Sequence, residues 1–271
     1  MAARKIDFSK RCFFILSGIS NPLGKPLAIE MCRRFKPGSV AVLIESSEKD
    51  LQEVKKAVQF ATNGVEVFGC CIENWQSTKA LIFRKILDTV LCKYSAAHFE
   101  LAFLLHNEGS GATQMLIEPQ DSQGWMSYVQ ENLYSVVSLN QEFLKLSQFD
   151  GVEKLVVNIT SSLQIQPFVY NSLMCSCKKA RDMYFRAMAS DEGRRQNVSV
   201  LNYSPGMLES HVPIRDLNNN IIDLAGFGLS EKLLKLPRVK PLKSTLQLIN
   251  ILETLSFCSG HDVDYYDTFN L

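Results

Sequence analysis

The strongest constraint on the fold is the regular alternation of short apolar runs with longer segments of helical period along the chain. Runs this apolar are typical of strands covered on both faces, and parallel strands need a crossover segment between them. The alternation therefore predicts an α/β fold, a doubly wound parallel sheet of seven strands with helices on both faces. The expected strands are Cys12–Ser17, Val40–Ile44, Val65–Cys70, Leu101–Leu105, Lys154–Ile159, Val198–Tyr203 and Val263–Tyr266.

The segments between these strands predict helices. They are expected at Pro22–Phe35, Glu48–Ala61, Ser77–Tyr94, Gln123–Leu146, Tyr170–Ser190 and Leu242–Leu255. In the last of them, Leu242, Leu246, Ile249 and Leu252 recur at helical spacing, which predicts the buried face. Residues 211–238 have mixed period, and we interpret them as a helical insertion over the carboxyl edge of the sheet, within one domain spanning residues 1–271.

The charge balance of the chain indicates which classes of partner it can bind. Lys and Arg together number 29 and Asp and Glu 28, so the net charge is +1 and there is no basic excess to neutralise a phosphate backbone. The longest apolar runs, such as Cys12–Leu16 and Leu101–Leu105, are too short to cross a bilayer, and the N-terminus lacks the apolar core of a signal peptide. We therefore expect a cytoplasmic protein with no nucleic-acid or membrane partner.

The cysteines raise the question of disulfides or a metal site. They are Cys12, Cys32, Cys70, Cys71, Cys92, Cys175, Cys177 and Cys258. In a reducing compartment, cysteines within apolar runs are expected to be buried free thiols. Cys175 and Cys177 have no companion pair at metal-ligand spacing and the histidines are scattered, so no metal site is predicted.

A glycine-containing turn, Ser17–Gly24, directly follows the first of these strands and opens a helix. In doubly wound sheets of the Rossmann type, ligands bind at the carboxyl ends of the strands, where N–H groups at a helix N-terminus bind phosphate. The turn therefore predicts a nucleotide site, with a plain strand-to-helix turn as the alternative.

Several motifs together resemble the short-chain dehydrogenases/reductases, and some resemble the sepiapterin reductase branch of that family. The turn is similar to the family's T-G-x-x-x-G-x-G sequence. The further matching stretches are HNEG at 106–109, where the family has N-N-A-G, VVNITS at 156–161, QPF at 166–168, KARDM at 179–183, LNYSPG at 201–206 and the tail at 259–267. The resemblance extends over nearly the whole chain and implies hydride transfer from a nicotinamide nucleotide to a pterin side-chain ketone.

The catalytic residues implied by the resemblance are incomplete. Ser161 stands where the family orients the carbonyl, Lys178 where it lowers the pKa of a tyrosine, and Asn132 where it completes a proton relay. The tyrosine position, thirteen residues after Ser161 and four before Lys178, holds Met174, which has no proton to donate. Tyr170 lies about 12 Å from Lys178 along a helix, too far for the pair to cooperate. The activity is therefore expected to be impaired, and the alternative is a pseudoenzyme that binds pterin or nucleotide or pairs with an active reductase.

The resemblance also implies a binding site for NADP or NAD. Its residues are Gly18, Ser20, Asn21, Gly24, Glu45, Ser46, Glu73, Asn107, Lys178, Pro205 and Ser210. Pro22 replaces the central glycine of the turn, which removes one N–H from the phosphate cradle. Asn21 and Ser46 stand where relatives carry arginines for the 2′-phosphate. Glu45 stands where an acid binds the ribose 2′-hydroxyl in NAD-preferring members, which argues against a strong NADP preference; an exposed Glu45 without that role is the alternative.

The substrate residues implied are Ser161, Met207 and Asp264. A carboxylate accepts two N–H bonds at once, which suits the amino group and ring nitrogen of a pterin, whereas an exposed acid without a ligand is the alternative for Asp264. Met207 and Cys175 fit an apolar pocket or the core equally well. The helices at Gln123–Leu146 and Tyr170–Ser190 form the usual dimer surface of the family, so a homodimer is expected.

Overall fold

The computed structural model describes residues 3–75, 80–95, 97–109, 122–165, 171–192, 197–209 and 235–270 of the chain. Seven strands form a parallel sheet in the order β4-β3-β2-β5-β6-β7-β9, which confirms the predicted fold class. The strands are β2 (Cys12–Ser17), β3 (Ser39–Glu45), β4 (Val65–Cys71), β5 (Leu101–His106), β6 (Glu153–Ile159), β7 (Val198–Ser204) and β9 (His261–Asp264).

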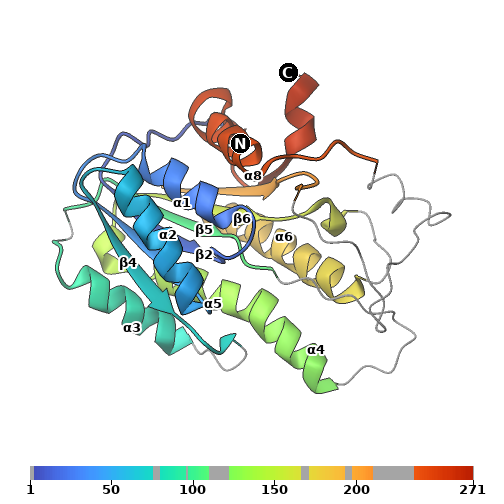
Figure 1. Ribbon diagram of the computed structural model, residues 1–271, viewed down its shortest axis with the longest axis horizontal. Coiled ribbons are helices and arrows are strands. Elements are labelled where there is room, and N and C mark those ends of the chain that lie inside the picture. Colours follow the sequence, from blue (N-terminus) through green and yellow to red (C-terminus); the bar gives the residue numbers. More distant parts are fainter. Residues whose placement is uncertain are drawn as a thin grey trace.

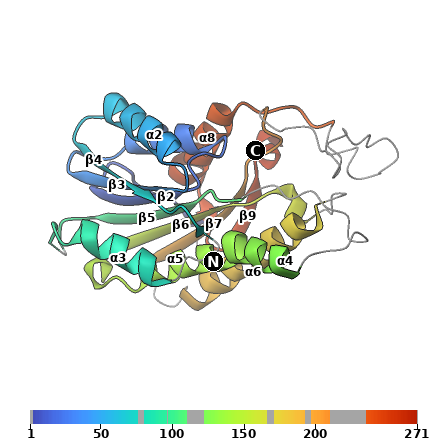
Figure 2. The ribbon, with the colours of Figure 1, turned by 60° about the horizontal axis from the view of Figure 1, so that its bottom comes forward.

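Helices cover both faces of the sheet (Figures 1 and 2). On one face lie α1 (Gly24–Cys32), α2 (Glu48–Ala61) and α8 (Pro241–Asn250), and on the other lie α3 (Ala80–Leu91), α4 (Ser122–Val129), α5 (Ser135–Leu144) and α6 (Ser172–Glu192). Successive side chains of a strand point to opposite faces, so Phe13 and Phe14 of β2 enter the two separate cores. A strand buried on both faces has to be apolar throughout, which explains the continuous apolar run.

The C-terminal segments differ from the prediction. The last strand, β9, ends at Asp264, and Tyr265–Asn270 form a 3₁₀-helix where Val263–Tyr266 was expected as a strand. The predicted buried stripe of the last helix is wrong in its first half, since Leu242 is 48% and Leu246 41% exposed while Ile249 and Leu252 are buried. The buried face instead runs through Thr245 and Leu248.

Three further features were not predicted. The segment expected as one helix over Gln123–Leu146 is divided by a π-helix, Gln130–Tyr134, between α4 and α5, and a second π-helix, Ile251–Leu255, follows α8. A short antiparallel pair, β1 (Ala3–Arg4) and β8 (Phe257–Cys258), lies outside the main sheet.

The expected helical insertion at 211–238 lies outside the described residues except for 235–238. Tyr170, Ser210 and the stretch 166–168 also lie outside them. All eight cysteines are free, but Cys71 and Cys92 are exposed, so the expectation of buried thiols is wrong for these two. Across the described ranges, no helix has the length and hydropathy that a membrane span requires.

The topology fixes where a ligand site can form. The chain runs outward from β2 through β3 to β4 and then returns to place β5 on the other side of β2. The carboxyl ends of β2 and β5 are therefore the point at which the strand order reverses, which is where doubly wound sheets bind ligands. The turn at Ser17–Gly24 and the segment after His106 meet at this point.

Candidate functional site

The glycine turn packs directly onto the end of β5. Gly18 has φ +71°, and a Cβ there would lie 2.7 Å from the carbonyl carbon of Asn107. At Gly24, the first residue of α1, a Cβ would lie 2.1 Å from the carbonyl oxygen of Ile19. Both positions therefore require glycine, the first for its conformation and its contact and the second for the close approach of helix and turn.

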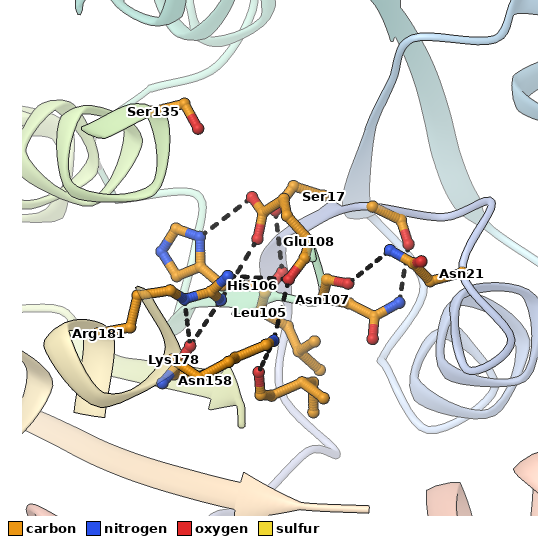
Figure 3. A network of polar contacts seen from close by, with 12 residues as sticks. Ser17, Asn21, Leu105, His106, Asn107, Glu108, Ser135, Asn158, Lys178 and Arg181 are labelled. Carbon is orange, nitrogen blue, oxygen red and sulfur yellow. Dashed lines mark hydrogen bonds and ion pairs between the residues drawn. The ribbon is translucent and has the colours of Figure 1, made fainter. Parts of the chain in front are cut away.

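Hydrogen bonds join the turn to β5 (Figure 3). The Asn107 side chain donates from Nδ2 to the carbonyl oxygen of Gly18 at 2.7 Å. Asn21 in turn donates from Nδ2 to the carbonyl oxygen of Asn107 at 2.9 Å. These two residues, both predicted to bind a cofactor, hold the turn in place through their side-chain amides.

Glu45 is not an exposed acid. It ends β3, is 5% exposed, and its Oε2 accepts a hydrogen bond from the backbone N–H of Ser20 at 2.8 Å. Its Oε1 accepts from the N–H of Ser46 at 2.7 Å and from the Ser46 hydroxyl at 3.0 Å. The carboxylate thus places a negative charge against the glycine turn and brings together three of the residues predicted for the cofactor.

Lys178 lies on α6 beside the ends of β5 and β6. Its Nζ donates to the carbonyl oxygens of Ile159 at 3.0 Å and Glu108 at 3.3 Å, and the residue is 7% exposed. Burial lowers the pKa of Lys178 well below its usual range, the positive charge of Arg181 lowers it further, and Glu108 and Cys177 oppose that shift.

A buried ion pair beneath Lys178 was not predicted from the sequence. The Arg181 guanidinium, 1% exposed, donates from Nη1 to the carbonyl oxygen of Glu108 at 2.8 Å, and its Nη2 lies 3.7 Å from Oε2 of that residue (Figure 3). Oε1 of Glu108 lies 3.4 Å from Nδ1 of His106. Burial alone raises the pKa of Glu108, but His106, Arg181 and the Ser17 hydroxyl outweigh it and lower that pKa to about 2.

The ion pair contacts a row of polar side chains that crosses the sheet. Register places Ser17, His106, Asn158 and Asn202 beside one another on β2, β5, β6 and β7. Oδ1 of Asn158 accepts from Nε and Nη2 of Arg181 at 3.0 and 2.6 Å, and its Nδ2 donates to Asn202 at 2.8 Å. The sequence signal for this row is one polar residue near the end of each apolar strand, which identifies the row only once strand order is known.

The remaining predicted catalytic residues come from three elements. Ser161 follows β6 and is half-buried, and Met174 is half-buried in the first turn of α6. Asn132 is buried within the π-helix, where its Nδ2 donates to the carbonyl oxygen of Tyr128 at 3.0 Å. The π-helix packs against α6, and such helices are frequent at functional sites.

Two of the predicted substrate residues, Asp264 and Met207, both contact Tyr266. Asp264 ends β9, and its Oδ1 accepts from the N–H of Tyr266 at 3.0 Å; burial raises its pKa, and the Ser204 hydroxyl and the Tyr266 N–H oppose the shift. The N–H of Met207 donates to the Tyr266 hydroxyl at 3.0 Å. Pro205 is buried after β7 and its carbonyl oxygen accepts from Ser244.

Glu73 is exposed just beyond the end of β4. Among the described residues, no contact ties it to the turn. Its role in cofactor binding therefore stays a prediction.

The model of the short chain dehydrogenase family matches residues 14–218 of the chain. Sepiapterin reductase of Xenopus tropicalis is 28% identical over 260 residues, which cover 93% of this chain and 95% of the relative. Sepiapterin reductase of Mus musculus is 28% identical over 262 residues, covering 93% and 96%. Among solved structures, L-sorbose reductase from Gluconobacter frateurii, complexed with NADPH and L-sorbose, matches with a TM-score of 0.73 at 17% identity, covering 96% of this chain and 97% of that one.

Proposed function

Since the chain belongs to the short-chain dehydrogenase family, we propose that it binds a nicotinamide dinucleotide and a pterin, and that it reduces the pterin's side-chain ketone slowly. The observation that carries this proposal is the meeting of the glycine turn, Asn107 and Lys178 at the point where the strand order reverses. The similarity to sepiapterin reductases over 93% of the chain supports the substrate class.

The residues at this edge fit a dinucleotide. Gly18 and Gly24 let the turn pack closely against Asn107 and Ile19, which fixes the turn at the carboxyl edge of the sheet. The Thr160 hydroxyl, 3% exposed at the end of β6, has no hydrogen-bond partner among the described residues, which supports a polar ligand there. The chemistry that a reduced nicotinamide supplies when bound is hydride transfer to the carbonyl carbon. Lys178 would hold the nicotinamide ribose, and Pro205 and Ser210 the nicotinamide itself.

The cofactor preference follows from charge. Glu45 binds the N–H of Ser20 in the turn, and neither Asn21 nor Ser46 is cationic. A carboxylate repels a 2′-phosphate and can accept a hydrogen bond from a ribose hydroxyl. We therefore propose that the chain has no preference for NADP over NAD.

Reduction of the ketone needs a proton for the alkoxide oxygen. Ser161 would hold the carbonyl oxygen by a hydrogen bond, but Met174 cannot donate a proton. General acid catalysis contributes about 10²–10⁴-fold, or roughly 3–5 kcal/mol of barrier. Positioning of the reactants remains, so turnover is slow rather than absent. Asp264 would bind the pterin ring through its carboxylate, with Met207 beside it.

A second candidate is a non-catalytic subunit that holds pterin or nucleotide, alone or paired with an active reductase. Met174 is the observation that favours it. For the reductase candidate we propose assembly as a homodimer. Exposed apolar side chains on α4, the π-helix and α6 support that assembly, because Met126, Tyr134 and Met183 are 68%, 48% and 57% exposed.

A thermal-shift panel tests the proposal. Wild type and Met174→Tyr are melted with NADH, NADPH or sepiapterin, with glucose 6-phosphate as the control ligand. A ligand at about 100 times its Kd adds about 2.7 kcal/mol to the stability and raises the Tm by several degrees. We expect NADH and sepiapterin to raise the Tm of both proteins. Absence of a shift with any nucleotide or pterin would contradict both candidate functions.

A further inference from the structure

The environment of the Lys178 side chain points beyond the binding role given to it above. We propose that the amine of Lys178 is a nucleophile that forms a Schiff base with a small aldehyde or an activated ketone. This reaction needs neither a nucleotide nor the missing tyrosine. The same amine is assigned to the nicotinamide ribose in the proposed function, so the reaction is tested without nucleotide.

The hydrogen-bond partners of the Lys178 amine are uncharged. Its Nζ donates to two backbone carbonyl oxygens, of Ile159 and of Glu108, and no carboxylate lies within 4.0 Å of it in the described part of the chain. The Glu108 carboxylate faces Arg181 and His106 instead. Carbonyl oxygens accept hydrogen bonds from a neutral amine as well as from an ammonium ion, so nothing at this position requires the charged form.

The second observation is the nearby cation. Arg181 lies one helical turn after Lys178, and both side chains donate to the same oxygen, the carbonyl of Glu108 (Figure 3). Guanidinium stays protonated in proteins, so it repels an ammonium ion at Lys178. Burial also lowers the pKa of Lys178. The Glu108 and Cys177 side chains raise this pKa, but less than burial and Arg181 lower it. A buried lysine next to a second cation is the arrangement that activates lysine for Schiff-base chemistry.

The third observation concerns access. Lys178 is 7% exposed, which limits its partner to small carbonyl compounds. Gly109 borders the amine, and a Cβ at this glycine would lie 2.9 Å from Nζ. Any other residue there would crowd the amine. Glycine at position 109 therefore keeps a side chain away from the nitrogen.

The reaction balances with the atoms at hand. The lone pair of Nζ attacks the carbonyl carbon, the carbonyl oxygen leaves as water with the two amine hydrogens, and a carbon–nitrogen double bond forms. Sodium cyanoborohydride then delivers hydride to that carbon and converts the protonated imine into a stable secondary amine. The neighbouring Lys179 is the internal control, because it is exposed and its Nζ pairs with Oδ2 of Asp182 at 3.2 Å.

The test is reductive alkylation of the full chain with limiting propanal and cyanoborohydride at pH 7, without nucleotide or pterin. Peptide fragmentation by mass spectrometry assigns the propyl group to Lys178 or Lys179. We expect Lys178 to react at least about tenfold faster, because burial and the charge of Arg181 lower its pKa and so raise the neutral fraction of the amine. Equal or slower labelling of Lys178 would overturn the proposal.

Two variants sharpen the result. Lys178→Arg keeps the positive charge and should abolish the fast adduct, whereas Lys179→Arg should retain it. Persistence of the fast adduct in Lys178→Arg would assign it to another site and overturn the proposal. If Lys178→Arg does not fold, the comparison of the two lysines within the wild-type chain still decides.

Discussion

The polar side chains at the carboxyl edge of the sheet are bound mainly to one another. Glu45 binds the turn through Ser20, Asn107 binds it through Gly18, and Glu108 is held by Arg181. Each of these contacts buries a charged or amide group that needs a partner once it leaves water. The site is therefore preorganised by hydrogen bonds within the protein itself.

The buried carboxylate of Glu108 predicts how stability depends on pH. Its pKa falls from 4.5 in the unfolded chain to about 2 in the folded one, so its contribution is complete above pH 4.5 and is lost as the pH falls through 2. The shift corresponds to roughly 3 kcal/mol. Glu108→Gln should lower the free energy of unfolding at pH 7 and flatten its decline between pH 5 and 2, measured by urea denaturation.

The matched control for this prediction is Glu53→Gln. Glu53 is an exposed carboxylate whose Oε1 lies 2.7 Å from Nζ of Lys25. Exposed pairs of this kind contribute little, so the acid limb should keep its wild-type slope. An unchanged acid limb in Glu108→Gln would show that the carboxylate is not held in its charged form.

The charge on Glu45 predicts cofactor choice. Wild type should bind NADPH no more tightly than NADH in a fluorescence titration. Glu45→Gln removes the repulsion of a 2′-phosphate and should improve NADPH relative to NADH by about tenfold, which equals 1.4 kcal/mol. Glu48→Gln, an exposed acid in the first turn of α2, is the control and should leave the ratio unchanged. Clearly tighter NADPH binding by wild type would contradict the assignment of Glu45.

At the scale of elements, α4 and α6 lie side by side and carry the exposed methionines Met126 and Met183 (Figures 1 and 2). If this surface joins two copies of the chain, replacing each methionine with glutamate would place an unpaired charge in the interface. The dimer should then be strongly weakened. We expect a dimer for wild type and a monomer for Met126→Glu/Met183→Glu in sedimentation velocity. The control is Phe60→Glu on α2, since Phe60 is 95% exposed on the opposite face. A monomeric wild type would contradict the proposed assembly.

Local sequence signals predicted the bounds of some elements but not the neighbours that cover them. The bounds of Cys12–Ser17 and Glu48–Ala61 were predicted to the residue, because an apolar run and a capped amphipathic segment are local signals. The buried face of α8 was wrong at Leu242 and Leu246, because helical spacing selects a stripe but not the neighbour that covers it. The π-helix at Gln130–Tyr134 has no local signal of its own.

In the candidate site, too, some residues could be predicted from the sequence and others could not. Gly18, Gly24 and Asn107 were predicted from motifs, and the structure brings them together. The pair of Glu108 and Arg181 was not predicted, because the two residues are 73 positions apart and meet only through strand order. Ser210 lies outside the described residues.

The whole molecule has the short-chain dehydrogenase fold, and the reductase site that we propose in it lacks a proton donor. The frame of β2, β5 and α6 that places Asn107 and Lys178 is intact. In the proposed reaction, the loss of a single proton donor, at Met174, limits turnover.

Oxidation of NADH or NADPH with sepiapterin, followed by nicotinamide absorbance in wild type and Met174→Tyr, tests this claim most directly. A restored proton donor should raise kcat by about 10²–10⁴-fold, with little change in KM, because general acid catalysis acts in the transition state. Met183→Tyr, which places a tyrosine on the exposed surface of the same helix, should leave kcat at the wild-type value. Unchanged turnover in a Met174→Tyr protein that still binds nucleotide and sepiapterin would contradict the account.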